Sequence, residues 1–322
     1  MKKNPKVSVV MATRNRAHLL ERSINSILKQ RKCNFELIII DNDSEDNTKE
    51  IVKNLQRKDK RIRYYLYKKC LGPSNARNVG IKKARGKYIA IMDDDDISLP
   101  GRLYTQQKYL DEHPDVFMVC GAVKWVDKYG KKIGIFPGIL QRNAWPETAE
   151  DVFKLLYLKS NKVPNTTIMV RKFWKNKFCL YPPEFSIGED WFLFMKLSLE
   201  GAYIKGLSQI FVNQLRDSNE SSLMQNKASA FKQNKEELKI INKLLKKKNP
   251  KLYKEYSKLA WSNLLTGKVR YLYAIGKRKR GILLTLNALL LSPHNESAYN
   301  ALIELSKRLI KRWCRKWKEF IN

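Results

Sequence analysis

The sequence NARNVGIKKARGKYIAIMDDDDISLP occupies residues 75–100 and contains the most informative pattern in the chain. It combines a predicted helix, Ser74–Ala84, with a short apolar strand, Tyr88–Met92, and four consecutive aspartates, Asp93–Asp96. Like charges at a strand end repel one another, and a divalent cation with oxygen ligands resolves that conflict. The alternative is a solvated acidic turn. Because the run lies in a strongly basic chain, the cation is the favoured interpretation.

Strand and helix signals alternate upstream of this stretch. Short apolar, β-branched runs predict strands at Val7–Met11, Phe35–Ile40 and Ile62–Tyr67. Apolar residues at helical spacing predict helices at His18–Lys29 and Thr48–Lys58. The alternation predicts an α/β fold with a mostly parallel central sheet flanked by helices.

Polar residues stand at the carboxyl ends of three of these strands. They are Thr13, Asp41 and the run Asp93–Asp96. Ligands of such sheets bind at the carboxyl ends of the strands. We therefore expect these residues to surround one crevice, although they are far apart in the sequence.

The middle of the chain is less regular. Strand-like pieces occur at Phe117–Val126 and Thr166–Val170. A predicted helix, Trp191–Glu200, begins at the pair Glu189-Asp190. Asp is a favoured residue at a helix start, so capping is one explanation of Asp190.

The chain changes character near residue 225, which predicts a boundary between a domain at 1–225 and a basic, helical C-terminal region at 226–322. This region holds 24 lysines and arginines against six glutamates. Within it, 274–291 is expected to form a pair of helices. Residues 297–322 combine an apolar face, two tryptophans and a basic face, which is typical of helices on an anionic membrane surface. Docking of the same apolar face on the protein's own core is the alternative.

The bulk composition limits the class of protein. The net charge of +33 attracts polyanions such as nucleic acid, anionic lipid or nucleotide phosphates, although a compositional bias explains part of it. Five scattered cysteines, without a CxxC motif, indicate reduced thiols, and three histidines make a zinc site unlikely on composition. Secretory signals are not found, and the longest apolar runs are about half of the ~20 residues that span a bilayer. A cytoplasmic protein, or a peripheral one at the inner membrane face, is therefore expected.

Four segments in order carry a family resemblance. They are VSVVMATRNR at 7–16, LIIIDNDSEDNT at 37–48, the stretch at 75–100, and IGEDWFLFMKL at 187–197. Together they resemble the family 2 inverting glycosyltransferases of GT-A fold, over about residues 5–215. The resemblance implies transfer of a sugar from a nucleoside diphosphate donor, in particular a UDP-sugar, with Mn²⁺ or Mg²⁺. The implied acceptor is a hydroxyl of a cell-surface glycan or a lipid-linked precursor.

The resemblance also implies roles for individual residues. Asp190 is the implied catalytic base, with Glu189 and Trp191 on the acceptor side. Asp95, with Asp93, is the implied metal ligand. The residues implied at the donor are Thr13, Arg16, Asp41, Arg77, Asn78, Asp93, Asp94 and Arg216. Relatives often have a histidine after the last of these, where this chain has Asp217, so a third protein ligand is in doubt.

Two other functions compete with this interpretation. The charge and the tryptophans of the C-terminal region suit a nucleic-acid-binding protein, but no recognised nucleic-acid motif is present. A catalytically inactive relative that acts as an assembly partner is the second, and the intact acidic residues argue against it. The chain contains neither a Walker A loop nor GxGxxG. The sequence QRNAW at 141–145 differs from the QxxRW of processive synthases, which favours transfer of one or a few sugars.

Overall fold

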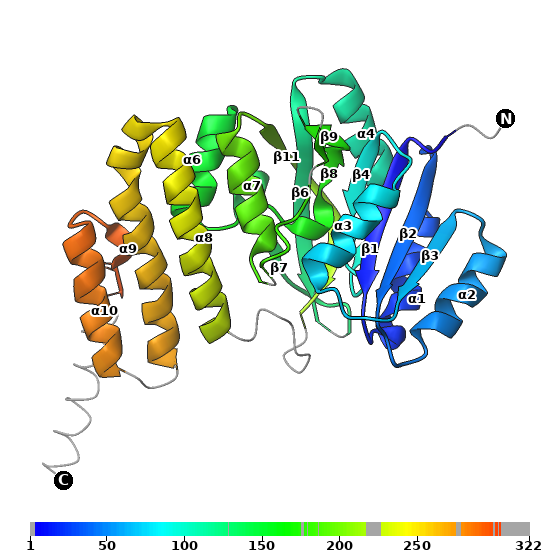
Figure 1. The fold of residues 1–322 in the computed structure, drawn as a ribbon, viewed down its shortest axis with the longest axis horizontal. Coiled ribbons are helices and arrows are strands. Elements are labelled where there is room, and N and C mark those ends of the chain that lie inside the picture. The colour runs from blue at the N-terminus through cyan, green and yellow to red at the C-terminus, as the bar shows by residue number, and fades with distance from the viewer. Residues whose placement is uncertain are drawn as a thin grey trace, which may run out of the picture. The chain divides into compact units, whose positions relative to one another are not determined.

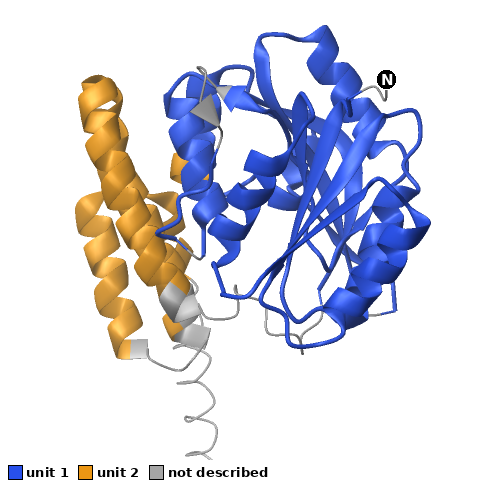
Figure 2. Cartoon of the chain, turned by 45° about the vertical axis from the view of Figure 1, so that its right-hand side comes forward, with its two compact units in different colours: residues 1–156, 160–221 blue, residues 157–159, 222–322 orange. Residues whose placement is uncertain are grey.

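The chain folds into two compact units (Figure 2). Unit 1 comprises residues 1–156 and 160–221, and unit 2 comprises residues 157–159 and 222–322. The predicted boundary at 225/226 and most of the predicted helix 297–322 lie outside the described residues. The computed structural model describes residues 4–127, 129–174, 177–178, 180–185, 187–216, 227–274, 278–298, 300–301 and 303.

Unit 1 is built on a nine-stranded sheet with the order β3-β2-β1-β4-β8-β6-β11-β5, in which β7 pairs with β6 (Figure 1). Strands β3, β2, β1 and β4 are mutually parallel, as are β6 and β11, while β8, β7 and β5 run antiparallel to their neighbours. The predicted α/β fold with a mostly parallel sheet is confirmed. The strands are β1 Val7–Thr13, β2 Phe35–Asn42, β3 Ile62–Tyr67, β4 Tyr88–Ile91, β5 Ile97–Ser98, β6 Val116–Val126, β7 Lys132–Phe136, β8 Met169–Arg171 and β11 Tyr203–Leu215, with a separate pair β9 Phe173–Trp174 and β10 Lys177–Phe178.

Helices cover both faces of this sheet. The core beside α1, α2 and α4 takes alternate side chains of β1, such as Val9 and Met11. The opposite face receives α3, where Gly80 lies so close to Val10 that a side chain there has no room. Strands buried on both faces explain the uninterrupted apolar run of β2. The helices are α1 Ala17–Leu28, α2 Thr48–Lys58, α3 Pro73–Lys83, α4 Arg102–Glu112, α5 Gly138–Gln141, α6 Ala149–Lys159 and α7 Glu189–Leu199.

The strand predicted at Thr166–Val170 is wrong in its first half. Residues Asn165–Thr167 form a 3₁₀ turn, and β8 begins only at Met169. The Thr167 hydroxyl contacts the carbonyl oxygens of Pro164 at 2.8 Å and Gly121 at 3.0 Å. Local bonds of this kind compete with strand pairing and hold the turn.

Unit 2 contains the helices α8 Lys227–Lys248, α9 Pro250–Ala274 and α10 Arg278–Leu291. Asn249 separates the first two, and its side-chain oxygen accepts a hydrogen bond from the amide of Leu252 at 3.0 Å. The helix pair predicted within 274–291 is wrong, because Ala274 ends α9 and the described residues 278–291 form the single helix α10. Among the helices that the structure describes, none is long and apolar enough to cross a bilayer.

Candidate functional site

The carboxyl ends of β1, β2 and β4 lie side by side, as the sequence predicts. Thr13 is the register partner of Asp41 in the parallel ladder. Strand β4 pairs with the other side of β1 and ends at Ile91, two residues before Asp93. The parallel order therefore gathers three segments that are far apart in the chain.

Asp41 is fully buried, and its carboxylate accepts hydrogen bonds from two other groups of the protein. The Tyr64 hydroxyl donates to its Oδ2 at 2.5 Å, and the Ser44 amide donates to its Oδ1 at 3.0 Å. Burial and the adjacent Asp41 carboxylate raise the pKa of Tyr64. Asp41 thus fixes the turn after β2 that would border a ligand at this edge.

The backbone of the acidic run is anchored to α1. The Ser23 hydroxyl lies against the carbonyl oxygen of Asp93 at 3.1 Å and also contacts that of Asp96. Arg22 donates to the carbonyl oxygen of Asp95 at 2.9 Å. These contacts fix the turn and leave the carboxylates of the run to other partners.

Arg102 lies beneath the run and is completely buried. Its Nη2 donates to the carbonyl oxygen of Ile91 at 2.8 Å. Burial lowers its pKa to about 10, while the carboxylates of Asp96 and Asp93 act in the opposite direction. The guanidinium therefore remains charged at neutral pH and offsets part of the negative charge of the run.

Two carboxyl groups of the run, those of Asp94 and Asp96, have raised pKa values. Burial, followed by the charge of Asp95, raises the pKa of Asp94 to about 7, while the hydroxyl of Thr13 lowers it. The Thr13 hydroxyl lies near enough to Asp94 to affect its pKa, but it does not meet the distance and angle of an ordinary hydrogen bond with any described residue. Burial also raises the pKa of Asp96, whose Oδ2 accepts from Gln214 at 3.4 Å. Arg16 Nη1 lies 3.7 Å from Asp95 Oδ2.

A divalent cation fits this arrangement. The pKa of Asp94 is raised first by burial and then by the charge of Asp95, and a bound cation would oppose both effects. No cluster of three or more histidine, cysteine or acidic side chains that could hold a metal is found within the described ranges. Mg²⁺ and related ions commonly bind through one or two carboxylates, with substrate phosphates and water completing the shell. The run supplies that number of carboxylates.

Replacing Asp94 by Asn is expected to stabilise the metal-free protein at high pH. The folded pKa of about 7 exceeds the ordinary value of 3.8, so the stability associated with this group is fully present at low pH and is lost as the pH rises through about 7. An amide does not ionise. The gain in Tm over wild type should therefore be near zero at about pH 4 and largest above about pH 8, roughly 2–4 °C for each kcal/mol relieved. Differential scanning calorimetry of the variant and the wild type over this pH range measures the difference in Tm.

The matched control for that experiment is Asp115→Asn, at an exposed aspartate just before β6. It removes one negative charge from the surface and so controls for the change in net charge. A gain for Asp94→Asn that stayed constant over the range would contradict the explanation, and added Mn²⁺ should reduce the gain.

The helix α7 carries the second acidic pair of the site. It begins after Gly188, whose φ of +81° suits a residue without a side chain. Asp190 accepts hydrogen bonds from Asn161 Nδ2 at 3.0 Å and from the amide of Trp191 at 2.7 Å. Burial, and after it the charge of Glu189, raise the pKa of Asp190 to about 7. A carboxylate with this pKa is poised to take a proton near neutrality.

Arg77 joins the two acidic parts of the site. Its Nη2 lies 3.2 Å from Asp93 Oδ1, and its Nη1 lies 2.7 Å from Glu189 Oε1. The guanidinium carbon also lies 5.5 Å from the ring centre of Tyr181. Both carboxylates raise the pKa of Arg77 against the opposing effect of burial. One buried cation therefore connects the end of β4 with the start of α7.

Helix α3 places Arg77 by holding the segment before α7. The Ser74 hydroxyl donates to the carbonyl oxygen of Phe185 at 2.8 Å. The Asn78 amide donates to the carbonyl of Tyr181 and accepts from its N–H, each at 2.8 Å. Asn78, expected near the nucleotide, is thus buried and committed to the backbone of this segment.

Two predicted site residues, Arg216 and Trp191, contact other parts of the protein. Arg216 is exposed, and its guanidinium lies over the ring of Trp125 at 5.0 Å. Trp191 is buried, and its indole N–H donates to the carbonyl oxygen of Leu156 at 2.9 Å. Asp217 lies outside the described residues.

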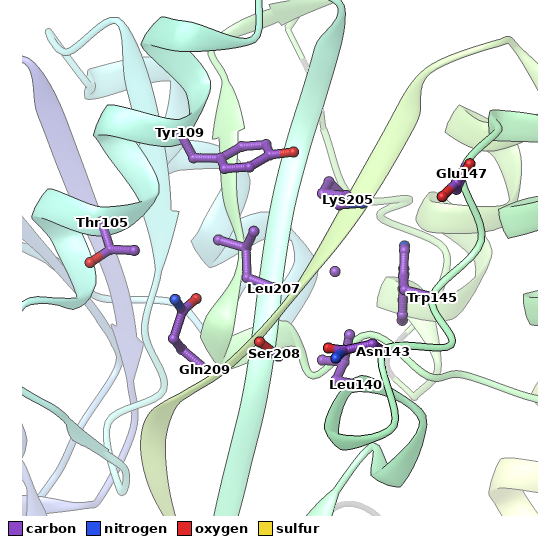
Figure 3. Close-up of a pocket in the computed structure, with 11 residues that line it drawn as sticks. Thr105, Tyr109, Leu140, Asn143, Trp145, Glu147, Lys205, Leu207, Ser208 and Gln209 are labelled. Atoms are coloured by element: carbon purple, nitrogen blue, oxygen red, sulfur yellow. The ribbon is translucent and has the colours of Figure 1, made fainter.

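The cavity in Figure 3 lies elsewhere in unit 1. It has a volume of about 340 Å³, and none of the predicted site residues lines it. Because it lacks a cluster of acidic side chains, we assign the candidate site to the acidic residues and not to this cavity. Its lining includes Tyr109, Leu140, Trp145, Glu147, Lys205 and Gln209.

Sequence reasoning missed several groups that hold the site. Asn161 and Tyr64 are polar residues without a motif, and no local signal marks them. Ser23 lies on the buried face of α1, where a serine among Leu20, Ile24 and Ile27 could have indicated a polar partner across the sheet end. Arg102 follows the acidic run by six residues, and its positive charge could have suggested that it offsets the negative charge of the run.

The chain is similar to known glycosyltransferases. Residues 8–179 match the family model described as Glycosyl transferase family 2. An uncharacterized glycosyltransferase of Rickettsia bellii is 33% identical over 70% of this chain and 31% of its own length. The GalNAc(5)-diNAcBac-PP-undecaprenol beta-1,3-glucosyltransferase of Campylobacter jejuni is 42% identical over 36% of this chain and 38% of its own length. The chain spans less than half the length of the first curated relatives that it matches.

A solved structure supports the fold. The crystal structure of S. aureus TarS 1-349 in complex with UDP-GlcNAc superposes with a TM-score of 0.64. It is 18% identical and covers 95% of this chain and 92% of that one. At this identity the likeness concerns the fold, and the expected GT-A type is confirmed.

Proposed function

Because this chain belongs to glycosyl transferase family 2, we propose that it is an inverting, metal-dependent glycosyltransferase. It moves a sugar from a nucleoside diphosphate donor to a hydroxyl group of a glycan or lipid-linked acceptor. The observation that carries the proposal is Arg77, whose contacts with Asp93 and Glu189 unite the acidic run and the start of α7 in one site.

The donor binds at the carboxyl ends of β1, β2 and β4. Asp95, with Asp93, holds Mn²⁺ or Mg²⁺, which when bound neutralises the charge that develops on the departing diphosphate. Asp93 or Asp94 contacts the ribose. Thr13 lines the nucleotide pocket, and Asp41 holds the turn after β2 that borders this pocket. Arg16 lies beside the run, where its cation attracts phosphate.

The acceptor hydroxyl loses its proton to Asp190 as it attacks the sugar. The raised pKa of Asp190, the hydrogen bond from Asn161 and the start of α7 suit a general base held in one orientation. A base on the face opposite the leaving group gives inversion at the anomeric carbon. Glu189 and Trp191 form the acceptor side around it, and Arg216 leaves its position over Trp125 to contact the diphosphate.

The donor and the acceptor follow from likeness to other proteins. TarS was crystallised with UDP-GlcNAc, which supports a UDP-sugar as donor. The name of the C. jejuni relative specifies an undecaprenol-linked acceptor, which supports a lipid-linked acceptor here. We place the protein in the cytoplasm, peripherally at the inner face of the membrane through residues 297–322.

Binding of UDP-sugar with Mn²⁺ is expected to raise the Tm, because a ligand at a hundredfold excess over its Kd stabilises a protein by about 2.7 kcal/mol. A screen of nucleotide sugars by thermal shift identifies the donor, and UDP release in the presence of acceptor measures transfer. Asp95→Ala should remove the Mn²⁺-dependent part of the shift, and Asp115→Ala should keep it. If no nucleotide sugar shifted the wild type or released its nucleotide, the proposed function would fail.

A further inference from the structure

Helix α10 leaves several leucines exposed to water. Leu283, Leu286 and Leu290 have exposed fractions of 62%, 47% and 80%. The spacing i, i+3, i+7 places them on one stripe of the helix, about 10 Å long. We call these three leucines the α10 apolar face.

The opposite side of α10 packs within unit 2 through small residues. Gly281, Thr285 and Ala288 are buried. The Ser262 hydroxyl of α9 donates to the carbonyl oxygen of Ala288 at 2.6 Å. An ordinary surface helix turns its leucines toward its neighbour, and α10 does so only in part, because Leu284 and Leu289 are half-buried. The leucines of the α10 apolar face remain in contact with water and contribute little to the core of unit 2.

Cations accompany the apolar face. Lys279 lies one turn before Leu283 on the same side of the helix, and Arg280 follows it; both are exposed. Residues 226–322 hold 24 lysines and arginines against six glutamates. Exposed leucines beside a lysine and an arginine suit a membrane interface, which takes apolar side chains at the acyl boundary and attracts cations to the headgroups. The stems of the cationic side chains can follow the apolar surface while the charges reach the headgroups.

We propose that the α10 apolar face is a docking surface for an anionic lipid bilayer. The charge argues against a second copy of this chain as the occupant, because two molecules of net charge +33 would meet through surfaces that both carry cations. Anionic headgroups complement the cations, and the acyl boundary takes the leucines. The proposal concerns α10 alone and depends neither on sugar transfer nor on the expectation for residues 297–322.

Vesicle flotation of the full chain tests the proposal. The vesicles contain phosphatidylcholine with roughly one third phosphatidylglycerol, or phosphatidylcholine alone, at near-physiological salt. Wild type is expected to float with the anionic vesicles and to remain behind with the neutral ones. The double variant Leu286→Asn/Leu290→Asn keeps every cation and should bind anionic vesicles roughly tenfold or more weakly.

Matched variants separate this face from general hydrophobicity. Leu290→Asn should weaken binding, whereas Ile133→Asn, at an apolar residue of β7 that is 57% exposed, should not. Unchanged Tm values verify that both variants remain folded. Unaltered flotation of the double variant would overturn the proposal. So would a concentration-dependent dimer, seen by light scattering, that the double variant abolished while vesicle binding stayed the same.

Discussion

An Asp190→Asn variant is expected to transfer sugar roughly 10²–10⁴ times more slowly than wild type, which is the usual contribution of a positioned general base. The amide has the size of the carboxyl group and keeps the start of α7 intact, but it cannot take the proton of the acceptor hydroxyl. Donor binding should change little, because Asp190 is proposed to contact the acceptor hydroxyl and not the donor. Initial rates of UDP release with acceptor present, together with the Kd for UDP-Mn²⁺, measure both quantities.

The control is Asp151→Asn in the first turn of α6. Asp151 is exposed, and its amide donates to the Thr148 hydroxyl at 3.1 Å, so it occupies a helix start as Asp190 does. Its rate should equal that of wild type. If Asp190 served only to stabilise the start of α7, its Asn variant would lose Tm and keep its rate, and the assignment as base would then be wrong.

The pH dependence of the rate offers a second test of the same residue. The pKa of Asp190 is about 7, and a base acts only when ionised, so the rate should rise with pH and level off above about 7. Burial is the main cause of the raised pKa, and the charge of Glu189 is the next. Glu189→Gln removes that charge and should move the rising limb to lower pH.

The fold was largely readable from local patterns. Helix α2 and strand β3 have the predicted bounds, Thr48–Lys58 and Ile62–Tyr67, because apolar periodicity and turn residues act within a few positions. The order of parallel strands then placed Thr13 beside Asp41 without knowledge of any contact. Such inferences succeed where burial on a given face dictates the residue type.

The contacts that join the site residues could not be predicted from the sequence. Arg77 meets Glu189 across 112 positions of sequence, and Asn161 reaches Asp190 from a loop. A buried ion pair imposes no periodicity, and its partner is set by how α3 packs against the segment before α7. The acidic residues could therefore be recognised as chemistry, while the cation that joins them appeared only in three dimensions.

An Arg77→Met variant is expected to lose stability and activity together. It would leave the carboxylates of Asp93 and Glu189 near each other without their shared cation. Removing one partner of a fully buried pair typically costs roughly 3–5 kcal/mol, and the loss here should be smaller because the side chain of Asp93 is 28% exposed. The charge of Arg77 also lowers the pKa of Asp190, so its loss should move the rising limb of the rate to higher pH. Urea unfolding and a pH–rate profile measure the two effects.

A matched residue separates the positioning role of Arg77 from its structural one. Arg63 forms a 2.7 Å ion pair with the buried Glu36 and lies 5.5 Å from the ring centre of Tyr65, so Arg63→Met removes a similar cation. That variant should lose stability yet keep the wild-type pH profile, because its ion-pair partner Glu36 lies at the amino-terminal end of β2, whereas the site lies at the carboxyl ends of the strands. Adding Glu189→Gln to Arg77→Met should recover part of the lost stability, since the pair is then removed as a unit. If Arg77→Met and Arg63→Met shared one unshifted pH profile, Arg77 would be a structural residue and would not position the base.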